Sequence, residues 1–410
     1  MTADVIVVGA GLAGLACARS LHRAGRAVRV FEAGDEVGGR IRTDAHDGFL
    51  LDRGFQVFLS SYPEAQAVLD IPALELQTFE PGSLVRLGGQ FHALSDPWRR
   101  PIAGVCSAFS PVGTFADKLR VGLLRVSATR GKWQDRFADP EITTLAELQR
   151  RGFTPNMIER FFRPFLGGIF LDASLNTSSR MFGFVFRMFS EALASLPKHG
   201  MAAIPRQLAA GLPPGTVMLR SAVTGIETNA VRLASGAKIP ARAVVLATDA
   251  PAFAALTGDS AKPGRGVQCF YYSCGFAPVK PRMLVLNGTG TGPINNLCVP
   301  SVISPSYAPP GRHLVSVTVL QSSTEAEVRT QLVQWYGESA HAWKHLRTYT
   351  IPFALPDQTA PALANPERSV RVRPGLYCCG DHLDQASIQG ALVSGRRAAE
   401  AILTDCPSLS

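Results

Sequence analysis

The chain has 410 residues, of which 46% are hydrophobic and 18% are charged. This low charged fraction excludes a disordered chain, and the length predicts two domains with sizeable cores. The formal net charge of +9 suits an anionic surface or ligand, but over so long a chain it does not imply a nucleic-acid partner.

The beginning of the chain predicts a strand, a glycine turn, a helix and a second strand. The turn reads GAGLAG at 9–14, which is the G-x-G-x-x-G pattern of dinucleotide-binding folds. Gly9 permits the tight turn, Gly11 lets a pyrophosphate approach the backbone, and Gly14 lets helix and strand pack closely. Glu32 ends the second strand, where a carboxylate accepts hydrogen bonds from a ribose diol and disfavours a 2′-phosphate.

Three later segments complete the same domain. Residues 220–239 alternate like a β-meander that leads into a buried strand at 243–248, residues 375–381 predict a strand entering a turn, and 390–403 predict a helix. Because these pieces lie far apart in sequence, we predict an α/β fold with a Rossmann-like domain that is discontinuous and an inserted α+β domain. The expected boundaries are 1–75, 200–263 and 365–410 for the first domain, and 76–199 and 264–364 for the second.

Several motifs, in the same order, resemble those of the flavin amine oxidase and carotenoid (phytoene) desaturase superfamily of FAD-dependent oxidoreductases. After the glycine turn comes EAGDEVGGR at 32–40, which resembles the family segment that wraps the FAD pyrophosphate. LDRGFQ at 51–56 is similar to the segment beside the isoalloxazine ring. The segment 200–223 resembles the returning strand region near the adenine, and GD at 380–381 with ASIQGALVSG at 386–395 resembles the C-terminal flavin motif.

The resemblance implies noncovalent FAD, since no position matches the cysteine that binds flavin covalently in monoamine oxidases. Arg40 would offset the pyrophosphate charge, and Asp381 would accept hydrogen bonds from ribityl hydroxyls. The helix near Gln389 would point its N-terminus at the flavin N1/C2=O edge. The implied cofactor-binding residues are Gly9, Gly11, Gly14, Glu32, Gly38, Gly39, Arg40, Gly54, Phe55, Val223, Gly380, Asp381, Gln389, Gly390 and Ala391.

Two departures bear on the substrate. Amine oxidases of the superfamily carry a Lys that holds a water against flavin N5, and an aromatic wall of the amine cage; here these positions match Gln268 and Ser387. We therefore expect oxidation or desaturation of an apolar small molecule, isoprenoid-like or tetrapyrrole-like, by hydride transfer to flavin N5, with oxygen or a quinone as acceptor. The alternatives are an amine or amino-acid oxidase that produces hydrogen peroxide, and a flavin-binding protein without turnover.

No metal site is expected. His341 and His345 have helical spacing but lack the glutamate of an HExxH motif, and GTGTG at 288–292 is followed by Pro293 and predicts a plain loop. The chain also lacks the run of about 18 apolar residues that a transmembrane helix needs. Val5 to Val8 is too short for a signal peptide, and eight scattered cysteines favour reduced thiols, so we expect a cytoplasmic protein.

A basic segment, residues 98–136, holds eight Lys and Arg side chains against two Asp. Within it Phe115, Leu119, Leu123 and Val126 share one helical face. The pattern favours an ordinary amphipathic helix packed on a core, but it also leaves peripheral membrane contact open. Eight Phe residues between 161 and 189 predict core packing or, by the resemblance, the roof of an apolar substrate cavity.

Overall fold

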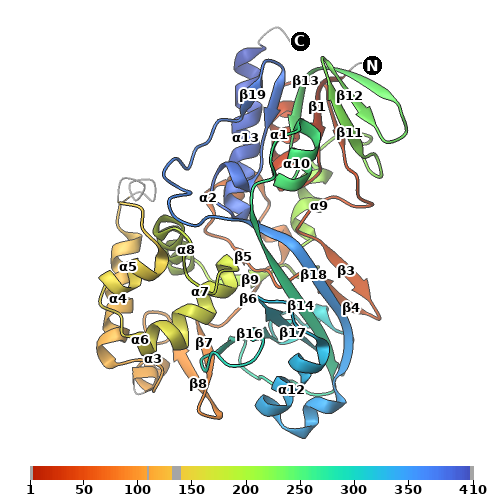
Figure 1. The fold of residues 1–410 in the computed structure, drawn as a ribbon. Coiled ribbons are helices and arrows are strands. Elements are labelled where there is room, and N and C mark those ends of the chain that lie inside the picture. Colours follow the sequence, from red (N-terminus) through yellow and green to blue (C-terminus); the bar gives the residue numbers. More distant parts are fainter. Residues whose placement is uncertain (1–2, 109, 132–139, 407–410) are drawn as a thin grey trace.

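The computed structural model describes residues 3–108, 110–131 and 140–406. Figure 1 shows two sheets one above the other, with both ends of the described chain beside the upper sheet and a group of helices at the lower left. Fold class is as expected from the sequence: a mixed α/β architecture with a parallel sheet of Rossmann type.

The upper sheet has eight strands in the order β10-β2-β1-β13-β12-β11, with β20 paired to β13 and β19 to β20. Val5 to Val8 of β1 are at most 4% exposed, because a central parallel strand is covered on both faces and needs a continuous apolar run. The bounds are β1 (Ala3–Val8), β2 (Val28–Phe31), β10 (Val217–Met218), β11 (Val223–Glu227), β12 (Ala230–Leu233), β13 (Lys238–Leu246), β19 (Arg371–Arg373) and β20 (Leu376–Cys378).

Strand β13 corrects the sequence interpretation, which separated the end of the meander from a buried strand at 243–248. The structure forms one strand that ends at Leu246. Its first half pairs antiparallel with β12, where Ala230 opposes Pro240, and its second half runs parallel to β1, where Val8 opposes Leu246. This change of partner within one strand places the residues after Leu246 directly beside the glycine turn.

Two long helices, α1 and α13, whose bounds are given below, pack against this sheet and against each other. Gly395 is close enough to Ala13 that a Cβ at 395 would lie 2.2 Å from the Ala13 carbonyl oxygen. Ser387 caps the second helix, because its Oγ accepts a hydrogen bond from the N–H of Gly390. The helices of this part are α1 (Leu12–Arg23), α2 (Pro63–Val68), α9 (Ala203–Ala210), α10 (Ala250–Thr257) and α13 (Ile388–Asp405).

The lower sheet has seven strands in the order β18-β14-β17-β16-β15-β7-β8. Its two longest strands, β14 and β18, pair from Gly264 opposite Pro356 to Ser273 opposite Lys344, and they run between the two bodies in Figure 1. The bounds are β7 (Gly82–Leu87), β8 (Gln90–Ser95), β14 (Gly264–Cys274), β15 (Leu284–Asn287), β16 (Ile294–Cys298), β17 (His313–Val319), β18 (Lys344–Pro356), α11 (Pro300–Ile303) and α12 (Glu325–Tyr336).

A block of helices flanks the lower sheet, and two small sheets lie between the bodies. The Phe residues of this block are mostly core: Phe162, Phe170, Phe182 and Phe184 are at most 5% exposed. The bounds are α3 (Pro101–Ala108), α4 (Phe115–Thr129), α5 (Thr144–Arg150), α6 (Pro155–Met157), α7 (Arg163–Phe170), α8 (Ser179–Glu191), β3 (Thr43–His46), β4 (Phe49–Asp52), β5 (Phe58–Leu59), β6 (Gln77–Thr78) and β9 (Ala194–Leu196). Among the described helices, none has the length and apolarity to cross a membrane.

A buried carboxyl group joins the two bodies. Asp52, at the end of β4, accepts hydrogen bonds from the Thr43 hydroxyl at 2.5 Å, the Met201 N–H at 3.0 Å and the Tyr307 hydroxyl at 2.9 Å. Tyr271 of β14 donates its hydroxyl proton to the Asp52 carbonyl oxygen at 2.8 Å. Residues from both sheets therefore converge on Asp52, just before the segment Arg53 to Gln56.

This network predicts a pH-dependent stability. Burial raises the pKa of Asp52 to about 6, although the three hydrogen bonds to its carboxylate oppose the shift. As pH rises, the Asp52 carboxyl therefore loses its proton at a lower pH in the unfolded chain than in the folded protein. The free energy of unfolding falls by about 3 kcal/mol between about pH 4 and pH 6 for this reason. Asp52→Asn cannot titrate, so urea denaturation should show a smaller destabilisation by this variant at pH 7 than at pH 4.

Asp259→Asn is the matched control, because Asp259 is exposed. Its effect on the free energy of unfolding should be small and equal at the two pH values. An Asp52→Asn destabilisation that does not change with pH would contradict the role given to this carboxyl group.

Candidate active site

The first glycine turn joins β1 to α1, and neighbouring atoms leave no room for a side chain at Gly9 or Gly14 but leave room at Gly11. Gly9 has φ +104°, and a Cβ there would meet the Ala247 carbonyl oxygen at 2.8 Å. A Cβ on Gly14 would lie 2.1 Å from the Gly9 carbonyl oxygen, so the helix lies directly against the turn. A Cβ on Gly11, in contrast, would meet no heavy atom within 4 Å. The open space lies at the N-terminus of α1, where unpaired N–H groups favour an anion.

The second glycine motif packs on the first. The N–H of Gly38 donates to the Ala10 carbonyl oxygen at 2.8 Å, and Gly11 and Gly38 form a parallel bridge. Gly39 is close to the same turn, since a Cβ on it would lie 3.5 Å from the Gly11 Cα. The two motifs therefore form one surface, from which Arg40 emerges.

Glu32 has a fixed carboxylate beside this surface. Its Oε2 accepts from the Ala10 N–H at 2.7 Å and its Oε1 from the Gly34 N–H at 2.8 Å. The N–H of Ser221 donates to the Glu32 carbonyl oxygen at 2.7 Å, which places Val223, at the start of β11, close by. Each carboxylate oxygen keeps a further acceptor site that a ribose hydroxyl can use.

Arg40 and Asp381 form a two-pronged ion pair that connects the second glycine motif to the C-terminal motif. The nitrogen–oxygen distances are 2.9 and 2.6 Å, and Arg40 also donates to the Ala354 carbonyl oxygen of β18 at 3.0 Å. Burial lowers the pKa of Arg40, but the charge and hydrogen bonds of Asp381 together with the charge of Asp249 outweigh it, and the net pKa rises. Gln56 donates its amide to the Arg40 carbonyl oxygen at 2.9 Å, so the 51–56 motif is tied to the same place.

The long strands bring Val267, the residue before Gln268, next to the 51–56 motif, and the Gln268 side chain points to the opposite face of the sheet. A Cβ on Gly54 would lie 3.0 Å from Cδ1 of Ile351, and Ile351 opposes Val267, the neighbour of Gln268. Both ends of the Gln268 amide are engaged: Nε2 donates to the Thr350 hydroxyl at 3.1 Å, and Oε1 accepts from the Ser323 N–H at 2.7 Å. The side chain is therefore held along the sheet by its own protein partners.

Residues of the C-terminal motif make hydrogen bonds within the protein that the sequence did not indicate. Ser387 is the N-cap of α13, which begins one residue before the expected Gln389. Gln389 accepts a hydrogen bond from the Glu64 N–H at 2.9 Å and so fastens α2 to α13. Gly380 donates its N–H to Ser394 at 3.0 Å, and Gly390 is in close contact with the Gln385 carbonyl oxygen. The contacts expected of these residues and of half-buried Ala391 and Phe55 with a flavin stay predictions.

Thr248 is a candidate residue that sequence reasoning missed. Its hydroxyl is buried and has no hydrogen-bond partner among the described residues, and its backbone N–H lies next to the Gly9 turn. The signal was present, because Thr248 follows a buried strand whose carboxyl end meets the glycine turn. Open space over Gly11 and an unsatisfied hydroxyl at the same edge fit a bound dinucleotide.

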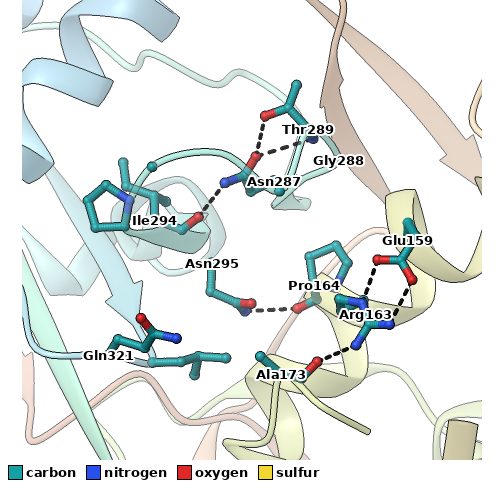
Figure 2. Close-up of a pocket in the computed structure, with 14 residues that line it drawn as sticks. Glu159, Arg163, Pro164, Ala173, Asn287, Gly288, Thr289, Ile294, Asn295 and Gln321 are labelled. Atoms are coloured by element: carbon teal, nitrogen blue, oxygen red, sulfur yellow. Dashed lines mark hydrogen bonds and ion pairs between the residues drawn. The ribbon is translucent and has the colours of Figure 1, made fainter.

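Two pockets lie beyond this surface. The smaller, about 210 Å³, is lined by Lys262, Asp357, Arg368 and His382 beside Asp381, and no sequence motif indicated this group of side chains. The larger, about 310 Å³, lies between α7 and the segment that joins β15 to β16, in which residues 288–292 form a plain loop as expected (Figure 2). In Figure 2 Arg163 pairs with Glu159, and Asn295 bonds to the Pro164 carbonyl oxygen. Among the described residues, no group of His, Cys, Asp or Glu could hold a metal ion.

The larger pocket is connected to Gln268 through the chain that follows β17. Leu320 and Gln321 line the pocket, and Ser323, two residues further, donates its N–H to Gln268. The pocket and Gln268 therefore lie at the same end of the lower sheet.

The parallel sheet, the paired glycine motifs and the fixed carboxylate define a dinucleotide-binding oxidoreductase of the flavoprotein type. The family model for flavin-containing amine oxidoreductases matches residues 12–403. The chain therefore belongs to the flavin-containing amine oxidoreductase family, and it is an FAD-dependent oxidoreductase, as the motifs predicted.

Individual relatives match over shorter stretches. The chain is 30% identical to coproporphyrinogen III oxidase of Propionibacterium freudenreichii subsp. freudenreichii over 176 residues, which are 40% of this chain and 31% of the relative. It is 46% identical to putrescine oxidase of Kocuria rosea over 85 residues, which are 20% of this chain and 18% of the relative. The matched regions thus span less than a third of these curated relatives.

A solved structure extends the likeness in fold. An oxidoreductase from Methanosarcina mazei has a TM-score of 0.76 at 18% identity, with 97% of this chain and 99% of that chain covered. At this identity the likeness concerns the fold alone.

Gly11→Val should abolish FAD binding without unfolding the protein. The added side chain points into open space, where it meets no protein atom but fills the position expected for the pyrophosphate. Fluorescence titration should show the loss of FAD affinity, and the thermal unfolding midpoint of the apoprotein should stay within a few degrees of wild type. Gly183→Ala is the control, since its Cβ also meets nothing within 4 Å but lies on α8, and it should bind FAD normally.

The purified protein should be yellow, and acid precipitation should release the flavin into the supernatant. Among the described residues seven cysteines are free. Burial raises the pKa of Cys269 and Cys298 because it disfavours the thiolate, and a hydrogen bond with Cys17 together with burial raises the pKa of Cys379. Colour that stays in the protein pellet would show a covalent bond and contradict the expectation.

Proposed function

We propose that this enzyme oxidises or desaturates an apolar small molecule of the isoprenoid or tetrapyrrole class. When bound, FAD would supply the redox chemistry by accepting a hydride at N5. The protein would bind and orient the substrate, exclude water and stabilise charge. Oxygen or a quinone would be the final electron acceptor.

The FAD would lie along the surface built from both glycine motifs. Glu32 and Val223 would hold the adenosine side, and Arg40 would face the pyrophosphate and Asp381 the ribityl chain. Gly54 would lie beside the ring. The remaining proposed contacts are Gly9, Gly11, Gly14, Gly38, Gly39, Phe55, Gly380, Gln389, Gly390 and Ala391. The FAD-binding domain would comprise 1–75, 200–263 and 365–410, and the substrate-binding domain 76–199 and 264–364.

The engagement of Gln268 carries the substrate proposal. Gln268 is a neutral amide, so it does not offer the ammonium group that holds a water in amine oxidases, and its two ends bond to Thr350 and Ser323. Ser387, in the position of the aromatic wall, uses its hydroxyl to cap α13. At these two positions the chain would therefore offer neither the charged nor the aromatic group that guides an amine.

Apolar surface is available on the substrate side. Phe161, Phe165 and Phe189 are half-buried at the edge of the Phe-rich core. The ring centroids of Phe161 and Phe165 are 5.4 Å apart, and those of Phe165 and Phe189 are 5.5 Å apart. Burial of apolar surface against such rings contributes about 25 cal/mol per Å² without a charged partner. The pocket between α7 and the segment that joins β15 to β16 would be the entrance. Similarity to a coproporphyrinogen III oxidase favours a tetrapyrrole, while similarity to a putrescine oxidase keeps an amine as the alternative.

The place of the reaction follows from the kind of substrate. A lipophilic substrate dissolves in membranes, so we propose a cytoplasmic enzyme that makes peripheral contact with a bilayer to collect it.

Porphyrinogens or isoprenoid polyenes should bleach the oxidised flavin under anaerobic conditions, while monoamines and polyamines should not. Stopped-flow absorbance near the flavin band gives the rate for each class. Fast bleaching by an amine, abolished by Gln268→Ala, would overturn the proposal in favour of an amine oxidase. No bleaching by any class would point to a flavoprotein that needs a different substrate.

A further inference from the structure

Helix α4 turns its most apolar face away from the protein. A helix packed on a core buries its apolar stripe, yet here the inner side carries Asp117 and Ala128 beside one large buried residue, Leu124. The sequence interpretation that favoured an ordinary core-facing helix is wrong for this face. The outward side chains, with their exposed fractions, are Phe115 (70%), Leu119 (61%), Leu123 (63%) and Val126 (38%).

The polar inner side has a structural reason. The Asp117 carboxylate is fully buried and accepts hydrogen bonds from the backbone N–H groups and the hydroxyls of Thr114 and Thr154. These bonds cap α4 and fasten it to the segment before α6. The rotation of the helix is therefore fixed by Asp117, and the apolar stripe cannot turn inward.

The apolar surface continues beyond α4. Trp98, which is 54% exposed, lies on α4 so closely that a Cβ on Gly122 would be 2.5 Å from its ring. Ile102, one turn later in the chain on α3, is 84% exposed. Together with the α4 stripe, these side chains account for six of the ten large hydrophobic residues that are exposed in the described chain. We call Trp98, Ile102, Phe115, Leu119, Leu123 and Val126 the apolar patch.

Positive charge surrounds the patch. Residues 98–131 hold six Lys and Arg side chains, and among the described residues their carboxylate partners are Glu80, Asp96 and Asp117. The segment keeps an excess of positive charge, to which exposed Arg130 contributes. Lys132 and Arg136, which the sequence interpretation also counted, lie outside the described residues.

We propose that the apolar patch docks this enzyme on the surface of a bilayer that contains anionic lipids. An apolar stripe bordered by Lys and Arg is complementary to such a bilayer, because the side chains enter the boundary of the acyl chains while the cations meet the headgroups. The 15-residue helix α4 would lie flat on the surface over about 22 Å. The proposal deepens the proposed function by naming the surface that makes the membrane contact.

Docking in this way would also place the larger pocket close to the bilayer. Arg160 donates to the carbonyl oxygen of Pro111, in the turn that leads into α4, at 2.7 Å. Its neighbour Glu159 and the following Arg163 line the pocket of Figure 2. A lipophilic molecule leaving the bilayer would thus have a short path to the pocket.

The test is flotation of the FAD-loaded protein with vesicles of phosphatidylcholine alone or mixed with phosphatidylglycerol. Binding should be strong to the anionic vesicles, weak to the neutral ones, and reduced as salt screens the cations. Equal binding to both kinds of vesicle, or binding to neither, would overturn the proposal.

Variants locate the contact. Leu119→Ser with Leu123→Ser should lower the partition to anionic vesicles at least about tenfold, since two exposed anchors are lost. Phe276→Ser is the matched control, because Phe276 is 50% exposed but lies in the loop after β14, and it should bind as wild type does. Flavin absorbance and the unfolding midpoint should be unchanged in both variants. A control that loses binding equally would overturn the assignment of the surface.

Two further readouts separate this proposal from its rivals. With a detergent-dispersed substrate, the double variant should reduce its flavin as fast as wild type, and with the substrate in vesicles more slowly. Vesicle binding without any flavin reduction would refute the proposed function but keep the docking surface. If the patch instead joins two copies, sedimentation should show a dimer that the double variant abolishes, without vesicle binding, and the lipid proposal would be wrong.

Discussion

The ion pair between Arg40 and Asp381 is the interaction on which the cofactor surface depends. It joins two motifs that are 341 positions apart in the chain. Asp381 is almost fully buried, so removing Arg40 would leave a buried carboxylate unpaired, which typically costs about 3–5 kcal/mol. Because Arg40 also binds the Ala354 carbonyl oxygen, the same guanidinium fixes β18 against the cofactor surface.

The strands β14 and β18 connect the Arg40–Asp381 ion pair to the lower sheet, because Arg40 bonds to β18 and β18 pairs with β14. Their register pairs Gln268 with Thr350 and the preceding Val267 with Ile351, whose side chain lies against Gly54. The buried Asp52 network also fixes the 51–56 motif, because the hydroxyl groups of Tyr271 and Tyr307 from the lower body donate hydrogen bonds to Asp52. The position of Gln268 is thus determined by pairing between distant segments, and its amide bonds to Thr350 of β18 and to Ser323 after β17.

The region around α4 follows a different constraint. One buried carboxylate, that of Asp117, receives four hydrogen bonds and decides which side of the helix faces inward. An apolar stripe on the outside raises the free energy of the isolated protein in water unless another apolar phase covers it. A surface of this kind and a lipophilic substrate are consistent with each other, since both find their favourable environment in a bilayer.

The sequence by itself determined the features that are local. The strand, glycine turn, helix and Glu32 lie within about thirty residues, and their conformations follow from glycine geometry and apolar periodicity, so a dinucleotide-binding α/β fold could be predicted. The family and FAD were predicted from the resemblance of several ordered motifs to those of known flavoproteins. Only the tertiary structure decided the rest. Periodicity shows that α4 has an apolar face but not where it points, because Thr154, from another segment, helps to set its rotation. The same holds for Ser387 as a cap, for β13 as one strand and for the two partners of Gln268, since each depends on atoms that are distant in sequence.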